Sequence, residues 1–150
     1  MPTTVRYGGA WRNAIPLVRY GGAWRNALVY VRHGGVWKLL TFTIGVSPAS
    51  AVGGCSRTTP GSCTAQTNHV YAQPQGGSGN YSYQWEYVSG DEFAIITPTM
   101  QGTAFSRTAD VGSPERVYTG YYRCRVTDNV TGAVAYTPNV MVQTSHSYTV

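Results

Sequence analysis

Residues 5–14 read VRYGGAWRNA, and residues 18–27 repeat the same ten letters. Residues 31–39 follow with VRHGGVWKL, so Val5, Val18 and Val31 set a period of 13 residues. A unit this short cannot bury an apolar face by itself and has to stack on neighbouring units or on other chains. The repeat therefore predicts a role in assembly rather than an active site.

Each repeat is predicted to form a β-hairpin. Two glycines between short β-prone runs are a signal for a two-residue turn, because both positions accept a positive φ. With Gly8 and Gly9 as the turn, Arg6 lies opposite Trp11. The same register gives the pairs Arg19–Trp24 and Arg32–Trp37. We expect each arginine to stack on its tryptophan, a contact worth about 0.5–1 kcal/mol when exposed.

Residues 1–40 are predicted to be an arm for attachment or oligomerisation. A single two-stranded hairpin is marginally stable in water, and three of them would expose a large apolar surface unless other protein covered it. We therefore expect the arm to become ordered against other subunits. The candidate interface residues are Arg6, Tyr7, Trp11, Arg19, Tyr20, Trp24, Arg32 and Trp37.

The net charge of +5 comes from the arm, which has six basic residues and no acidic one. The rest of the chain has five arginines against six acidic residues. A basic segment is typical of contact with DNA or another polyanion. Basic residues at fixed places in a hairpin are better explained by contacts with neighbouring tryptophans or with an acidic partner subunit. We therefore do not expect nucleic-acid binding.

Residues 41–150 show the two-residue alternation of half-buried strands. In residues 81–87, YSYQWEY, the aromatic side chains share one face, and in residues 120–126, GYYRCRV, Tyr122, Cys124 and Val126 share one face. Charged residues are only 11% of the chain, while Gly, Tyr, Thr and Val are abundant, which favours an all-β fold. Turn-forming clusters divide this part into about seven strands, a spacing typical of an antiparallel β-sandwich.

This part of the chain resembles an immunoglobulin-like (Ig-like) domain. Trp85 looks like the core tryptophan of that family, and Gly120-x-Tyr122-x-Cys124 looks like its tyrosine corner and second cysteine. The resemblance implies a partner cysteine near position 72, where this chain has Ala72. It therefore implies a core of Ala72, Trp85, Tyr122 and Cys124 without the usual disulfide, and with Cys124 as a buried free thiol.

Several short strings resemble Ig-like modules in virion proteins of tailed bacteriophages. They are VSPAS at 46–50, GGSGNYSYQW at 76–85, VSGD at 88–91, PT at 98–99 and RCRVTD at 123–128. The Gly-Gly-x-Trp repeat is similar to short repeats of phage tail-tip and fibre proteins. Such modules occur on tail tubes, tail tips, fibres and capsids, and a fold alone does not fix the function.

No motif in the sequence indicates catalysis, a cofactor or a bound metal ion. His33, His69 and His146 show no metal-ligand spacing, and Asp91 and Glu92 are adjacent rather than facing each other. Cys55 and Cys63 either close the loop between them as a disulfide or serve as small residues. The sequence has no secretory leader and no apolar run long enough for a membrane helix, so we expect neither a cleaved leader nor membrane insertion.

We therefore expect a non-enzymatic structural protein of a phage virion, assembled in the bacterial cytoplasm. Residues 1–40 would dock into the particle or form a homo-oligomer, for which a trimer is one symmetry, and residues 41–150 would face outward as a spacer or weak adhesin. Two alternatives stay open. One is a capsid decoration or head fibre, and the other is receptor binding to host-surface glycan through the loops near 76–80, 89–93 and 129–133.

Overall fold

The computed structural model describes residues 3–7, 10–14, 17–26, 30–33, 35–39, 42–111 and 114–148. Among these residues all regular structure is β-strand, and there is no helix able to cross a membrane. The strands are arranged in several sheets. The predicted all-β class is confirmed.

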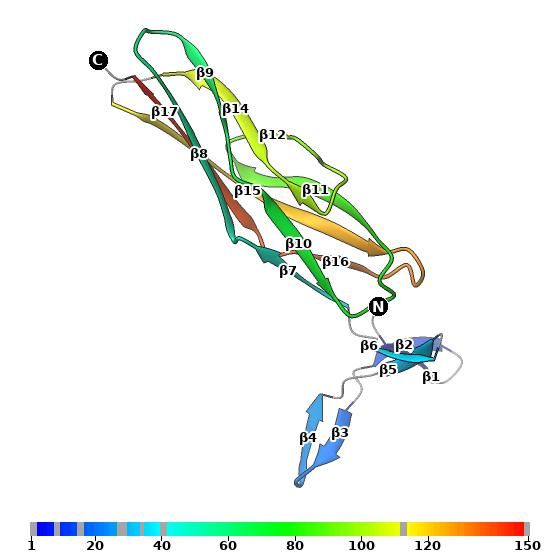
Figure 1. The fold of residues 1–150 in the computed structure, drawn as a ribbon. Coiled ribbons are helices and arrows are strands. Elements are labelled where there is room, and N and C mark those ends of the chain that lie inside the picture. Colours follow the sequence, from blue (N-terminus) through cyan, green and yellow to red (C-terminus); the bar gives the residue numbers. More distant parts are fainter. Residues whose placement is uncertain are drawn as a thin grey trace.

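The arm contains three hairpins, each a separate two-stranded sheet (Figure 1). Their strands are β1 (Thr3–Tyr7), β2 (Ala10–Ala14), β3 (Leu17–Tyr20), β4 (Ala23–Asn26), β5 (Tyr30–His33) and β6 (Val36–Leu39). The backbone register has the predicted pairs Arg6–Trp11, Arg19–Trp24 and Arg32–Trp37. The turn at Gly8 and Gly9 and the tryptophan side chains lie outside the described residues, so stacking of arginine on tryptophan stays a prediction.

The turn of the second hairpin is formed by Gly21 and Gly22. Their φ angles are 59° and 80°, in the region that residues with a side chain rarely adopt. A Cβ atom added at either position would meet nothing within 4 Å. Backbone conformation, and not lack of space, therefore requires glycine here, and two positive φ angles are what a two-residue type I′ turn demands.

The C-terminal part forms two layers of strands (Figure 1). The first layer consists of two three-stranded sheets in the orders β7–β10–β13 and β9–β14–β12. Its strands are β7 (Thr43–Ser47), β9 (Ser62–Gln66), β10 (Val70–Gln75), β12 (Ala94–Ile95), β13 (Gly102–Thr103) and β14 (Phe105–Asp110). The two sheets lie end to end, because β9 is followed by β10 and β13 by β14, and Thr67 N donates to Phe105 O at the junction (2.9 Å).

The second layer is one five-stranded sheet in the order β11–β15–β17–β8, with β16 also paired to β15. Its strands are β8 (Ser50–Arg57), β11 (Tyr81–Gly90), β15 (Arg116–Asp128), β16 (Val134–Tyr136) and β17 (Val140–Tyr148). All pairings in it are antiparallel except that of β17 with β8, which is parallel.

The chain changes layers between β7 and β8, where only Pro48 and Ala49 separate the two strands. The layers also meet along β8, since Val52 N donates to Asn68 Oδ1 (2.8 Å) and Asn68 N donates to Val52 O (3.1 Å). The edge strand β8 is thereby tied to the first layer as well as to its own sheet.

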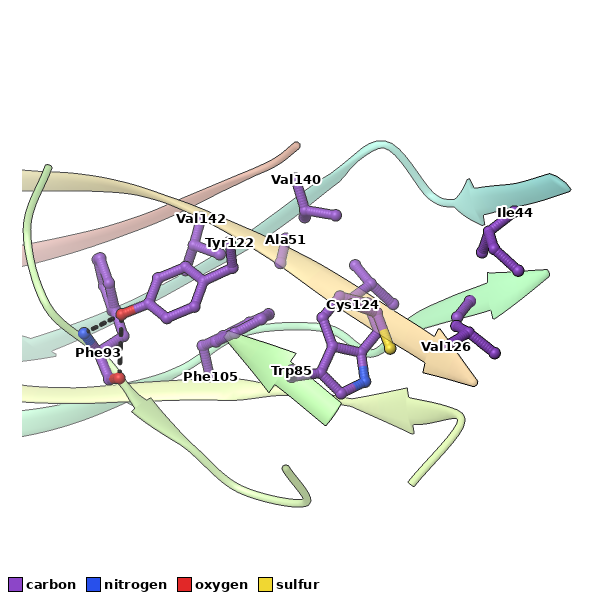
Figure 2. Packing of buried hydrophobic residues seen from close by; sticks show 12 residues of the cluster. Ile44, Ala51, Trp85, Phe93, Phe105, Tyr122, Cys124, Val126, Val140 and Val142 are labelled. Carbon is purple, nitrogen blue, oxygen red and sulfur yellow. Dashed lines mark hydrogen bonds between the residues drawn. The ribbon is translucent and has the colours of Figure 1, made fainter. Parts of the chain in front are cut away.

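The core lies between the layers, and three of its four large aromatic side chains meet at Phe105. Phe105 packs against Tyr122 with ring centroids 4.6 Å apart, and against Trp85 edge-on at 6.2 Å (Figure 2). Alternate residues of β15 and β17 point into it, as the two-residue period predicts for strands with one buried face. The other members are Ile44, Ala51, Val70, Ala72, Phe93, Cys124, Val126, Val140 and Val142.

Two details differ from expectation. About seven strands were expected in the C-terminal part. Two stretches expected as single strands are each divided into two, β9 and β10 by residues 67–69 and β13 and β14 by Ala104. The hydroxyl of Tyr122 does not bond to the backbone a few residues upstream, as a tyrosine corner would. It accepts from Phe93 N (2.6 Å) and donates to Phe93 O (3.1 Å), 29 residues away in sequence (Figure 2).

Candidate functional site

The hairpin arm is the first candidate site, and its backbone gives it a repeated geometry. In each hairpin, a basic residue and a tryptophan occupy directly opposite positions, one residue removed from the pair that flanks the turn. No described strand of one hairpin pairs with a strand of another. Each hairpin therefore has two strand edges with backbone groups that other protein can pair with.

The arm joins the C-terminal part at Phe42, and the end of the two layers around this residue is called the arm-proximal end. The ring of Phe42 stacks on that of Tyr81, with centroids 5.4 Å apart and an interplanar angle of 18°. The Tyr81 hydroxyl donates to Gly76 O. The chain thus enters the C-terminal part beside the 76–80 loop.

A buried carboxylate, Asp128, links the two loops of this end. It accepts hydrogen bonds from Ser78 N (2.6 Å), Ser78 Oγ (2.7 Å), Val130 N (2.9 Å) and Thr131 N (3.1 Å). Burial raises the pKa of Asp128, but these hydrogen bonds outweigh burial and lower the pKa to about 2. Both carboxylate oxygens of Asp128 accept at least one of these four hydrogen bonds. Asp128 is therefore a structural link between the two loops.

The three loops considered for glycan binding do not form one surface. Loops 76–80 and 129–133 meet at the arm-proximal end, where Asn129 Nδ2 donates to Asn80 Oδ1 (2.9 Å). The 89–93 loop lies at the other end of β11, about 30 Å away at the usual rise per strand residue. Two of the three loops therefore lie next to the junction with the arm, and glycan binding by any of the three stays a prediction.

The opposite, distal end is formed by the β8–β9 turn, the end of β14, the start of β15 and the end of β17. Val111 N donates to Gly61 O (2.9 Å), and Arg57 lies opposite Tyr148 in the parallel ladder. This end is the one that points away from the arm.

A cluster of Cys55, Cys63 and His146, called the cysteine–histidine cluster, lies near the distal end. Cys55 and Cys63 form a disulfide, which decides between the two readings that the sequence left open. His146 is fully buried, and its Nδ1 lies 3.1 Å from Cys55 Sγ and 3.8 Å from Cys63 Sγ. Cys55 on β8 is the ladder partner of His146 on β17, whereas Cys63 belongs to β9 in the first layer. The disulfide therefore joins the two layers.

The other ring nitrogen of His146, Nε2, lies 3.3 Å from Thr144 Oγ1, which is also buried. If Nε2 carries the proton, Nε2–H donates a hydrogen bond to the Thr144 hydroxyl and the Nδ1 lone pair faces the sulfur atoms. Burial and the nearby Arg107 lower the pKa of His146, whereas the Cys63 backbone raises it, with a net decrease. A neutral imidazole is the form that can act as a ligand or hydrogen-bond acceptor.

Sequence reasoning missed this cluster because local spacing gives no indication of it. His146 is 91 residues from Cys55, and only the parallel pairing of β17 with β8 brings them together. One signal was available: in β17 the inward positions continue past Val140 and Val142 to Thr144 and His146, two polar residues on a buried face. Buried polar side chains need partners, and these partners proved to be the cysteines and each other.

The residues expected from the family resemblance lie in the core. Ala72, Trp85, Tyr122 and Cys124 are all buried, and Cys124 is a free thiol. Burial raises the pKa of Cys124 to about 11, so the thiol stays protonated and unreactive at neutral pH. Trp85 Nε1 donates to Met100 O (3.0 Å), which satisfies its polar atom. These four residues support packing rather than chemistry.

Comparisons with protein-family models, with curated proteins and with solved structures find no match for this chain.

Proposed function

We propose that the protein is a structural component of the tail of a bacteriophage particle, at the tail tip or in a fibre. The arm docks into the particle or joins copies of the chain, and the C-terminal part projects outward as a spacer or weak adhesin. The observation that supports this most is the repetition of one hairpin with the same cross-strand pair three times. A binding pocket for a small ligand needs no such periodicity, whereas an interface built by stacking does.

The arm supports the proposal through its incomplete structure. An isolated hairpin is marginal in water, and stable sheets need at least a third strand or a packed face. Within the described residues, the three hairpins do not supply this to one another by strand pairing. Tryptophan and arginine are also the residues that most often dominate desolvated interfaces.

The C-terminal part is proposed to be an Ig-like domain. Its strand order supports this, because one layer runs β7, β9/β10, β13/β14, β12 and the other β8, β17, β15, β11, the arrangement of the two sheets of that fold. A sharp test uses the position of the missing cysteine. In an Ig-like core, Ala72→Cys should form a disulfide with Cys124, detected by peptide mapping with mass spectrometry. A free thiol at position 72 in a folded, oxidised variant would contradict the Ig-like assignment.

The orientation of the C-terminal part on the particle follows from the positions of its two ends. If the arm docks, loops 76–80 and 129–133 lie near the docking site, and the distal end with the β8–β9 turn faces outward. An adhesin role would then use the distal end rather than loops 76–80 and 129–133. Binding of residues 42–150 to host cells or glycan arrays would distinguish an adhesin from a spacer.

The assembly role is tested by comparing the mass of full-length protein and of residues 42–150 by light scattering after size-exclusion chromatography. We expect the full chain to be oligomeric and the truncated chain monomeric. The triple variant Trp11→Ala, Trp24→Ala, Trp37→Ala should dissociate like the truncation. As a control, Met100→Ala, Val117→Ala, Val130→Ala removes exposed apolar side chains of the C-terminal part and should leave the oligomer intact.

A peptide of residues 1–40 provides the complementary test. We expect it to be disordered or aggregated in isolation. A folded, monomeric peptide would overturn the proposal that the arm needs other protein. Mass spectrometry and immunoelectron microscopy of purified particles would then locate the protein on the tail or, for the alternative of a decoration protein, on the head.

A further inference from the structure

The cysteine–histidine cluster combines features that a simple disulfide does not need. A disulfide bond requires two cysteines only, yet here a fully buried imidazole directs Nδ1 at both sulfur atoms. The three atoms Cys55 Sγ, Cys63 Sγ and His146 Nδ1 all lie within 4.8 Å of one another. Two cysteines and a histidine are a common ligand set for zinc.

The distances suit a tetrahedral zinc ion. With Zn–S of about 2.3 Å and Zn–N of about 2.0 Å, tetrahedral angles place a sulfur and a nitrogen ligand about 3.5 Å apart. The two observed Sγ–Nδ1 distances, 3.1 and 3.8 Å, lie on either side of that value. The imidazole therefore needs little movement, and the main change is separation of the two sulfur atoms after their bond is broken.

The surroundings also resemble those of a metal ligand. Zinc-bound histidines usually donate their second ring N–H to a neighbouring group, which fixes the ring orientation, and Thr144 Oγ1 stands at that place beside Nε2. Both cysteines are only half-buried, which leaves room for a water molecule as fourth ligand. Two thiolates and a neutral imidazole bring the charge of Zn²⁺ to zero, so the cluster avoids a buried net charge.

We propose that, once the disulfide is reduced, Cys55, Cys63 and His146 bind one Zn²⁺ ion, which replaces the disulfide as the link between the two layers. The link would then persist under both oxidising and reducing conditions. This inference does not rest on the proposed phage function.

The reaction balances with a phosphine as reductant. The phosphine gives two electrons to the disulfide and takes an oxygen atom from water to become a phosphine oxide, and the two protons from that water yield two thiols. Binding of Zn²⁺ then forms two Zn–S bonds and releases these two protons to solvent. No further oxidant or reductant is involved.

The experiment uses the full-length chain with a water-soluble phosphine in metal-free buffer, and Co²⁺ as a spectroscopic probe. Thiol counting under denaturing conditions should give one thiol per chain before reduction and three after it, because the chain has three cysteines. The reduced protein should bind one Co²⁺ per chain, with thiolate-to-cobalt charge transfer and intense four-coordinate d–d bands. Zn²⁺ should abolish these bands, and the oxidised protein should show none.

Variants separate this site from adventitious binding. Cys63→Ser and His146→Gln should each weaken Co²⁺ binding at least about 100-fold, and Thr144→Val about 10–100-fold through loss of the partner of Nε2. Cys124→Ser and His69→Gln are matched controls outside the cluster and should bind Co²⁺ as the wild type does. Unchanged binding in His146→Gln, or cobalt bands that disappear only in Cys124→Ser, would overturn the proposal.

Folding is checked by circular dichroism in every sample. A folded, reduced wild type without cobalt bands overturns the proposal. If reduction unfolds the chain, addition of Zn²⁺ must restore the β-strand spectrum, and failure to do so overturns the proposal as well.

Discussion

At the residue scale, one buried carboxylate joins two loops of the arm-proximal end. The folded-state pKa of Asp128 is about 2, below its ordinary value of 3.8. A depressed carboxyl pKa adds stability that is complete above pH 3.8 and is lost as the pH falls toward 2. The shift corresponds to about 2.5 kcal/mol, because one pKa unit is worth about 1.4 kcal/mol.

Asp128→Asn should therefore lower the free energy of unfolding by about 2.5 kcal/mol at pH 7. The loss relative to the wild type should shrink as the pH is lowered from 4 to 2. Urea unfolding of both proteins across that range measures it. Asp110→Asn, at an exposed position, is the control and should show a loss below about 0.5 kcal/mol. An equal difference between wild type and Asp128→Asn at pH 2 and pH 7 would contradict the role of the ionised carboxylate.

A second effect at the residue scale is the loss of the hydrogen bonds that the buried Tyr122 hydroxyl makes. Tyr122→Phe removes both hydrogen bonds to Phe93 and leaves a buried backbone N–H and C=O without their partner. We expect a destabilisation of about 2–3 kcal/mol, since unsatisfied buried groups cost their full desolvation. Tyr121→Phe, at the exposed neighbouring position, should change stability by less than about 0.5 kcal/mol in the same thermal or urea measurement.

At the scale of elements, the disulfide closes the β8–β9 turn and links the layers. Its cysteines are 8 residues apart, and loop-closure entropy for that span predicts about 2.5 kcal/mol of stabilisation. Reduction of the wild type in the presence of a metal chelator should therefore lower the free energy of unfolding by about that amount. In the Cys55→Ala, Cys63→Ala variant, the reductant should have no effect.

The sequence predicts those elements whose structure is set by neighbouring residues. The hairpin register follows from an even-numbered turn, and the inward faces of residues 81–87 and 120–126 follow from the two-residue period of a strand with one buried side. In β11 that pattern ends at its bulge after Tyr87, where the register shifts and Tyr87 itself is exposed.

What the sequence does not reveal depends on pairing between distant strands. To predict the interruption between β9 and β10, one has to know that the Thr67 hydroxyl accepts a hydrogen bond from Phe105 N (3.0 Å). To predict that the 89–93 loop lies far from loops 76–80 and 129–133, one has to know the direction of β11. The cysteine–histidine cluster requires the parallel β8–β17 ladder, which no local pattern encodes.

At the scale of the whole molecule, every core residue of the C-terminal part lies between Ile44 and Val142. A domain with its own hydrophobic core is expected to fold alone. The arm, in contrast, consists of separate two-stranded sheets whose completion we assign to other subunits.

Residues 42–150 should therefore fold with a free energy of unfolding within about 0.5 kcal/mol of the same transition in the full-length chain, because distant, independent parts contribute additively. Urea unfolding followed by the fluorescence of Trp85 measures this cleanly, because the arm holds the other three tryptophans and its removal leaves a single reporter. The matched full-length sample is the Trp11→Phe, Trp24→Phe, Trp37→Phe variant, which keeps the arm and the same single reporter. A truncated chain that is unfolded, or less stable by several kcal/mol, would show that the arm packs against its own C-terminal part, and the hairpins would then be completed within one chain rather than by other subunits.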